Sequence, residues 1–329
     1  MTRIAAPSPE LASRQPPARP WAVAGATVVV LLLWASAFVV IRQVGHTLSP
    51  GPMALLRLTV GSLALVALAW RSRRPLPRGR TLVLVVAYGV SWFAGYTVVL
   101  NTAERHLDAG TSALLVNVAP IIVAVFAGLL LGEGFPRPLM VGIVIAFSGV
   151  VLIAAGGTHG HSERLGVVLG LVSAFLYGSA VLMQKVVLRS TDAVSATWIG
   201  CVAGTIALSG FAPQTVHEVA HASAGAIAGV VYLGLFPTAL AFTLWAYALS
   251  HTNAGRLAST TLTVPAIAVL MSWAALSEVP TVLGLLGGIL CLTGVAIGRR
   301  RPSPAREVDD VEVEREAVAL RDRVVERPG

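Results

Sequence analysis

Residues 109–120 read AGTSALLVNVAP and residues 254–265 read AGRLASTTLTVP, so one pattern occurs twice at an offset of 145 (254 − 109). At the same offset lie the pairs Pro120 and Pro265, Glu133 and Glu278, Gly142 and Gly287, and Gly149 and Gly294. A second block, LWASA at residues 33–37, returns as LYGSA at residues 176–180, offset by 143 (176 − 33). The chain is therefore a duplicated unit of about 140 residues.

The composition indicates a membrane protein. Only 12% of the 329 residues are charged and 55% are apolar, whereas a soluble domain carries about a quarter charged residues. Apolar stretches of about twenty residues, long enough to cross roughly 30 Å of hydrocarbon as helix, alternate with short polar segments. These stretches are too long and too uniform for barrel strands. The expected fold class is an all-α membrane protein.

The net charge of +8 does not indicate a nucleic-acid partner. The basic residues stand between apolar stretches, where membrane topology accounts for them. Cys201 and Cys291 both fall inside apolar stretches, so they predict neither a disulfide framework nor a metal site. We expect no metal and no cofactor.

The hydropathy pattern predicts ten transmembrane helices, five in each repeat. In the first repeat, residues 22–155, the helices are expected at 22–41, 52–70, 81–103, 109–131 and 138–155. In the second repeat, residues 166–298, they are expected at 166–187, 193–211, 225–248, 254–276 and 281–298. Residues 1–21 then form an N-terminal tail, and residues 299–329 form a charged C-terminal tail.

The distribution of basic residues predicts the orientation, because cytoplasmic loops are enriched in arginine and lysine. With the N-terminus inside, the cytoplasmic connections before residue 299 carry twelve: Arg3, Arg14, Arg19, Arg71, Arg73, Arg74, Arg78, Arg80, Arg137, Lys185, Arg189 and Arg256. The opposite side carries three: Arg42, Arg105 and Arg164. Both tails are therefore expected in the cytoplasm.

An odd number of helices per unit means that the second repeat crosses the membrane in the opposite sense to the first. Inverted repeats are an architecture of secondary transporters, in which two alike halves open a midplane site alternately to each side. A duplicated scaffold without transport activity is the plainer alternative. A channel and an intramembrane hydrolase are less favoured, because the inverted duplication favours a carrier and no predicted span interior contains an aspartate.

Two prolines and two glutamates repeat between the halves. Pro120 and Pro265 each lie eleven residues into a predicted span, where proline frees the carbonyl four residues earlier and so creates either a hinge or a packing kink. Glu133 and Glu278 lie at span ends, just before the next helix. There a carboxylate can cap the helix N-terminus, so we favour a structural role for both over proton coupling.

Arg57 is the one clearly intramembrane cation, and its equivalent in the second repeat is Gly200 (57 + 143). An ionisable residue within a span is a functional candidate, and a guanidinium suits a carboxylate or phosphate. The two interpretations are contact with substrate or a gate, and a structural ion pair with an acid such as Glu104. Glu104 and Asp108 also remain candidates for ion coupling at the outer ends of the spans.

Positions that differ between the repeats predict the substrate cavity, because an asymmetric substrate needs asymmetric contacts. These uncharged polar and aromatic candidates are Tyr96, Asn101, Asn117, Trp245, Thr260 and Thr261. Hydrogen bonds between helices, or anchoring at the lipid interface, are the structural alternatives for these residue types.

The duplicated motifs resemble those of the drug/metabolite transporter superfamily, in particular its ten-helix EamA-like branch. The matching residues are Leu33 to Phe38, Arg57, Ala109, Gly110, Pro120, Gly132, Glu133, Gly142 and Gly149, and then Tyr232 to Gly234, Ala254, Pro265, Glu278, Gly287 and Gly294. The similarity covers about residues 22–298 and leaves both tails outside.

This resemblance implies a multi-pass carrier of the plasma (inner) membrane, which exports a small polar metabolite such as an amino acid by alternating access. A multidrug or toxic-compound exporter of the same fold is the alternative. The expected partners are a small-molecule substrate and the lipid bilayer, and no enzymatic activity is expected. The sequence leaves the substrate, the coupling ion and the choice between monomer and homodimer open.

Overall fold

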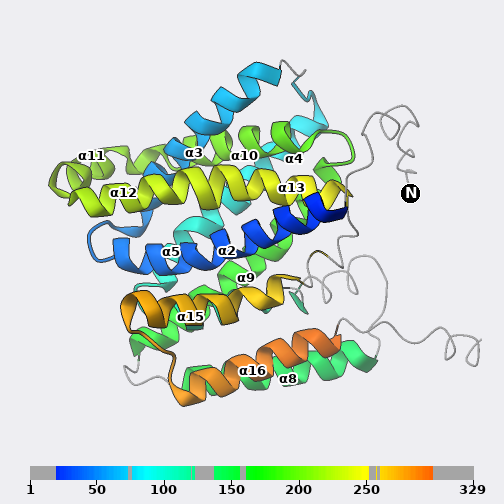
Figure 1. The fold of residues 1–329 in the computed structure, drawn as a ribbon, viewed down its shortest axis with the longest axis vertical. Helices are drawn as coiled ribbons and strands as arrows, with labels where there is room; N and C mark the ends of the chain where they lie inside the picture. Colours follow the sequence, from blue (N-terminus) through cyan, green and yellow to red (C-terminus); the bar gives the residue numbers. More distant parts are fainter. Residues whose placement is uncertain are drawn as a thin grey trace, which may run out of the picture.

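The computed structural model describes residues 20–72, 76–119, 121–122, 137–155, 161–251, 257 and 260–298. Every regular element in these ranges is a helix. The helices lie roughly side by side in a stack, with α8 and α16 together at one end (Figure 1).

The helices of the first repeat are α2 (Pro20–Val44), α3 (Pro50–Ser72), α4 (Arg80–Gly89), η1 (Val90–Tyr96), α5 (Thr97–Ala103), α6 (Ala109–Val116) and α8 (Arg137–Ala155). Those of the second are α9 (His161–Val187), α10 (Ala193–Ala207), η2 (Ser209–Phe211), α11 (Ala212–His221), α12 (Ala224–Leu233), η3 (Gly234–Leu240), α13 (Ala241–His251), η4 (Thr261–Thr263), α15 (Val264–Leu276) and α16 (Val282–Gly298).

Five of the described helices are long and apolar enough to cross a membrane: Pro20–Val44, Pro50–Trp70, Arg80–Ala103, Glu163–Val187 and Ala224–His251. A sixth span is formed if Ala193–Ala207 and Ser209–His221, which meet at a bend of 48°, are counted as one. Arg137–Ile153, Thr261–Leu276 and Val282–Gly298 are shorter apolar helices. The all-helical membrane fold is therefore confirmed, while the count of ten spans stays a prediction.

Short side chains define where several of these helices begin. Asp108 accepts a hydrogen bond from the Thr111 backbone N–H at 2.8 Å, so it caps the N-terminus of α6. Asp192 caps α10 in the same way, and Ser223 caps α12. Such caps satisfy backbone donors that have no partner within the helix.

The pairing of α8 with α16 has a symmetry that follows from the duplication (Figure 1). A methyl group on Gly142 would lie 2.5 Å from the carbonyl oxygen of Gly294. Their repeat equivalents are Gly287 and Gly149, and a methyl group on Gly287 would lie 2.5 Å from the carbonyl oxygen of Gly149. Exchanging the halves thus maps one backbone contact onto the other, and glycine is what permits both close approaches.

The helix expected at 193–211 is interrupted in the structure. α10 ends at Ala207, and α11 follows it after the bend. In α11, Glu218 accepts hydrogen bonds from the backbone N–H of Ser49, at 2.7 Å, and from the Ser49 hydroxyl, at 2.5 Å. This amphipathic helix therefore lies over the connection between α2 and α3.

Candidate functional site

Each repeat carries a π-helical segment at an equivalent place. η1 occupies Val90–Tyr96 and η3 occupies Gly234–Leu240; subtracting the offset of 145 from the bounds of η3 gives 89–95. Pro237 lies inside η3 and has no N–H to donate to the Leu233 carbonyl oxygen, which accepts a hydrogen bond from the Thr238 hydroxyl at 2.8 Å. π-Helical turns inside α-helices are frequent at functional sites.

η3 holds Arg57 through this same threonine. Arg57 Nε donates to Thr238 Oγ1 at 2.8 Å, and the arginine is only 6% exposed. Gly234 lets the two helices meet, because a methyl group there would lie 2.7 Å from the Arg57 carbonyl oxygen. The expected alternative of an ion pair with Glu104 is not formed, since no ion pair joins these two described residues.

Arg57 lines a cavity of ≈ 50 Å³, here called the central cavity. Six aromatic residues line it: Trp34, Phe38, Trp92, Tyr96, Tyr177 and Phe242. Polar lining comes from Arg57, Asn117 and Thr261. The rings pack on one another, with centroids 5.0 Å apart for Trp92 and Phe242 and 5.3 Å for Trp92 and Tyr177. The cavity is thus a narrow aromatic chamber with one cation.

Both repeats contribute to this wall through equivalent positions. Trp34 and Tyr177 are equivalents (34 + 143), and so are Val116 and Thr261 (116 + 145). The central cavity therefore lies where the two halves meet. Arg57 breaks the symmetry, since its equivalent is a glycine.

The helices that carry Val116 and Thr261 are interrupted there. α6 ends at Val116, and Asn117 leaves the helical conformation with φ −73° and ψ 2°. Thr261–Thr263 form a 3₁₀ turn, after which α15 begins and places Pro265 in its first turn. Broken helices at a midplane site are a feature of transporters with inverted repeats. The matching proline of the first repeat, Pro120, lies outside the described residues.

Of the six residues that the sequence predicts to line the substrate cavity, three line the central cavity. Tyr96, Asn117 and Thr261 line the central cavity. Thr260 does not line it, and its hydroxyl donates to the Leu257 carbonyl oxygen at 2.6 Å. Trp245 lies behind the wall, 1% exposed, with its ring 4.9 Å from that of Trp34.

Asn101 lines a second, polar cavity of ≈ 240 Å³, here called the outer cleft because it lies at connections that the sequence predicts to be external. Its walls are Ile41, Arg42, Gly45, His46, Asn101, Glu104 and Arg105. Asn101 Nδ2 donates to the Pro50 carbonyl oxygen at 3.2 Å. Ile41 lines both cavities and so forms part of the partition between them.

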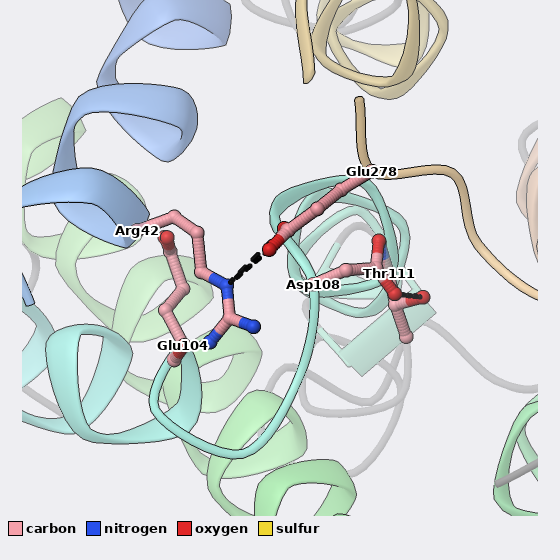
Figure 2. A network of polar contacts seen from close by, with 5 residues as sticks. All are labelled: Arg42, Glu104, Asp108, Thr111 and Glu278. Carbon is pink, nitrogen blue, oxygen red and sulfur yellow. Dashed lines mark hydrogen bonds and ion pairs between the residues drawn. The ribbon is translucent and has the colours of Figure 1, made fainter. Parts of the chain in front are cut away.

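Arg42 ties the two repeats together beside the outer cleft. Figure 2 shows its side chain reaching Glu278, with Glu104 beside it; Nε lies 3.2 Å from Glu278 Oε2. Arg42 Nη1 also donates to the backbone carbonyl oxygen of Glu104 at 2.8 Å. We call the Arg42–Glu278 pair the outer latch.

The capping role expected for Glu278 belongs to another residue. Thr281 Oγ1 accepts a hydrogen bond from the Gly284 backbone N–H at 3.0 Å at the start of α16. Glu278 lies too early to cap and binds Arg42 instead. Its repeat equivalent, Glu133, lies outside the described residues.

Sequence reasoning missed Thr238 and, apart from Tyr96, the aromatic residues of the cavity wall. Trp34 and Tyr177 stand at the same place in the repeated block of residues 33–37 and 176–180, and that recurrence was the available signal. Trp92 and Phe242 carry no such signal, because their equivalents are Pro237 (92 + 145) and Thr97 (242 − 145).

Comparison with known proteins identifies the class that this architecture represents. The EamA-like transporter family matches residues 21–155 and again residues 164–298. The two matches together cover more than half of the chain and coincide with the two repeats. The chain belongs to the EamA-like transporter family, and it is a multi-pass membrane transporter.

Individual relatives are similar over most of their length. A probable terminal-alkyne amino-acid exporter of Streptantibioticus cattleyicolor is 33% identical over 276 residues, covering 84% of this chain and 93% of that protein. An uncharacterized transporter of Bacillus subtilis, YdfC, is 33% identical over 80% of this chain and 86% of its own. A probable amino-acid metabolite efflux pump of Escherichia coli is 24% identical over 82% of this chain and 92% of its own.

A solved structure has the same fold. It superposes with a TM-score of 0.58 at 17% sequence identity, covering 85% of this chain and 98% of that one. At this identity the likeness concerns the fold alone.

Proposed function

We propose that this chain exports small amino acids with apolar or unsaturated side chains, and that the central cavity binds them. The observation that carries the proposal is the placement of Arg57, a buried guanidinium in the wall of an aromatic chamber at the junction of the two repeats. The names of the relatives from S. cattleyicolor and E. coli point to the same substrate class.

The chemistry of the cavity fits an amino acid. Arg57 uses Nε to bind Thr238, which leaves the two Nη groups to form a bidentate contact with a carboxylate. The Asn117 side-chain oxygen and the Thr261 hydroxyl are polar groups that suit the ammonium. The aromatic rings would then hold the apolar side chain.

The membrane arrangement that goes with this function is ten spans in two inverted repeats, residues 22–155 and 166–298. The mirrored contacts between α8 and α16 support it, as does the double family match. Residues 1–21 and 299–329 would face the cytoplasm of a cell with a plasma (inner) membrane. The outer latch and the Ser49–Glu218 contact would then both lie on the external side.

Transport by alternating access follows from this arrangement. Two similar halves that meet at one site can exchange conformations, which opens the site first to one side and then to the other. In the present structure the outer latch joins α2 of the first repeat to the segment before α16 of the second. Its breakage would accompany opening toward the outside.

A toxic-compound exporter of the same fold is a second candidate, since an aromatic chamber also accepts planar hydrophobic molecules. Arg57 separates the two candidates. A cationic dye would be repelled by the buried guanidinium, whereas a carboxylate would be attracted to it.

Counterflow in proteoliposomes tests the proposal with labelled L-propargylglycine, a terminal-alkyne amino acid, as the probe. We expect saturable counterflow by the wild type and no competition from the carboxamide analogue. Because a hydrogen bond to a charged group contributes about 1.5–3 kcal/mol, Arg57→Gln should raise the KM about 10- to 150-fold.

Arg189→Gln, which removes a cation from the loop between α9 and α10, is the matched control and should transport normally. Unchanged transport by Arg57→Gln would show that Arg57 does not bind the carboxylate of the substrate. Absence of counterflow with every amino acid, but its presence with a cationic dye, would favour the toxic-compound exporter instead.

A further inference from the structure

The outer cleft contains a carboxyl group that the proposed function does not use. Glu104 is 2% exposed, and neither of its carboxylate oxygens has a hydrogen-bond partner among the described residues. The Asn101 side-chain oxygen, in the same cleft, is also buried without a described partner. An ionised carboxylate in such a place is strongly disfavoured unless a cation pairs with it.

A suitable cation is adjacent but engaged elsewhere. Arg42 contacts the backbone carbonyl oxygen of Glu104 at 2.8 Å and places its Nε on the Glu278 carboxylate at 3.2 Å. Of the charges that favour the ionised form of the Glu104 carboxyl, Arg42 acts most strongly. Arg42 therefore has two carboxyl groups that it could pair with, Glu278 in the outer latch and Glu104 in the outer cleft.

The surroundings of Glu104 favour its neutral form in the present conformation. Burial raises the pKa of the Glu104 carboxyl well above its ordinary value, and the attraction of Arg42 and Arg57 lowers it only in part. Asp108 and Glu278 raise it further. Glu104 lies directly after the apolar span Arg80–Ala103, at its end.

The other elements around Glu104 bring few further charges to it. His46, from the connection after α2, and Arg105, from the connection after α5, line the cleft, and Tyr96 of η1 interacts with Glu104 electrostatically. α9 meets this end of α5 through Gly166, where a methyl group would lie 2.6 Å from Leu107. Arg42 is therefore the cation best placed to respond to ionisation of Glu104.

We propose that Glu104 is a proton-binding site whose occupancy is coupled to the outer latch. When the carboxyl holds a proton, Arg42 binds Glu278, as it does in this structure, and this contact keeps the outer end closed. When Glu104 releases its proton to water in the cleft, Arg42 moves onto the new carboxylate and Glu278 turns to solvent. One proton leaves for each latch that opens, so the external pH sets the balance between the two arrangements.

The test measures access to the central cavity and requires no substrate, so its result is independent of the proposed transport activity. Ala37, which lines the central cavity, is replaced by cysteine in a background with Cys201→Ser and Cys291→Ser. The labelling rate by a thiol reagent is measured on purified protein between about pH 5 and about pH 9. At each pH the rate is divided by that of the same protein carrying Glu104→Gln, which cancels the thiol's own titration.

Because one proton is involved, we expect this ratio to rise with pH by up to about tenfold per unit. Glu104→Gln mimics the protonated form and should keep the latch closed at every pH. Glu218→Gln, a change on the same side of the protein in α11, is the control. When it is added to both proteins, the ratio of their labelling rates should depend on pH as before. A ratio that is flat across the range would overturn the proposal.

Infrared difference spectra of the protein with native Glu104 provide a second measurement that does not depend on how well Glu104→Gln folds. The carbonyl band of a protonated carboxylic acid should disappear as the pH rises, in step with the labelling rate. Absence of such a titrating band would equally overturn the proposal.

Discussion

Cys291 and Ala146 are equivalent residues of the two repeats (291 − 145), and they are in contact: Cys291 Sγ donates to the Ala146 carbonyl oxygen at 3.3 Å. A residue can touch its own equivalent only near the axis that relates the two halves. Ser62 and Thr205, which are equivalent at the offset of 143 (205 − 62), make the same kind of contact at 2.9 Å. Two such self-contacts define where the halves of this transporter meet.

The glycines beside the first self-contact should be essential for packing. A methyl group on Gly149 would meet the carbonyl oxygen of Gly287 and would lie 2.7 Å from the Cys291 backbone nitrogen. Because neither backbone can move without separating α8 from α16, Gly149→Ala should destabilise the fold by about 1–3 kcal/mol. A lowered Tm of the purified protein in detergent would show this.

Gly25 provides the matched control for that substitution. It lies in α2 with nothing within 4 Å of an added methyl group. Alanine is the better helix former there, so Gly25→Ala should leave the Tm unchanged or raise it. Equal effects of the two substitutions would contradict the packing argument.

The duplication and the helical membrane fold could be predicted from the sequence, because both depend on spacing and hydropathy. The faces of the helices could not. Thr260 and Thr261 are adjacent, and each replaces an aliphatic residue of the first repeat. Only Thr261 lines the central cavity. One residue turns a helix by about 100°, and helices that are apolar all round give no sign of which face points inward.

The same reasoning explains why the sequence singled out Trp245 and passed over Phe242. The two lie three residues apart on α13, and only Phe242 lines the central cavity. α11 was missed for a different reason. Its polar, amphipathic sequence does not resemble a span, and its contact with Ser49 joins residues 169 positions apart.

Thr238 should control substrate affinity by positioning Arg57. Its hydroxyl accepts from Arg57 Nε and donates to the Leu233 carbonyl oxygen. Thr238→Val keeps the shape of the side chain but removes both hydrogen bonds, so the KM for L-propargylglycine should rise about tenfold. The kcat should change much less, because the guanidinium remains in the cavity.

A purely structural role for Thr238 would give a different pattern. In that case Thr238→Val would lower the amount of active protein, and so the maximal rate, and would leave the KM unchanged. Thr243→Val is the control, because the Thr243 hydroxyl donates to the Ala239 carbonyl oxygen one turn earlier and makes no described contact with Arg57. This variant should keep both constants near those of the wild type.

The outer latch should make a small contribution to closure. Its two side chains are 23% and 30% exposed, and pairs of this kind contribute about 0.2–1 kcal/mol. Glu278→Gln should therefore speed labelling of a cysteine at Ala37 by no more than about fivefold at neutral pH. Arg42→Gln should have a larger effect, because it also removes the bond to the Glu104 carbonyl oxygen.

Exchanging the charges checks whether this effect comes from the pair. The double variant Arg42→Glu with Glu278→Arg should label more slowly than Arg42→Glu alone, since opposite charges face each other again. Additive effects of the two substitutions would show that the ion pair does not hold the outer end closed.

Pro265 should act as a hinge beside the central cavity. It has no backbone N–H, and its ring excludes the normal helical position of the Thr261 carbonyl; a 3₁₀ turn at Thr261–Thr263 stands in place of a continuous helix. Pro265→Ala would let α15 extend back through this turn, which makes the helix stiffer and no less stable. The transport rate should then fall several-fold while the amount in the membrane and the Tm stay unchanged.

Pro213→Ala is the control, because Pro213 lies at the start of α11; this variant should transport normally. If Pro265→Ala instead lost transport rate and abundance in parallel, Pro265 would be a packing residue.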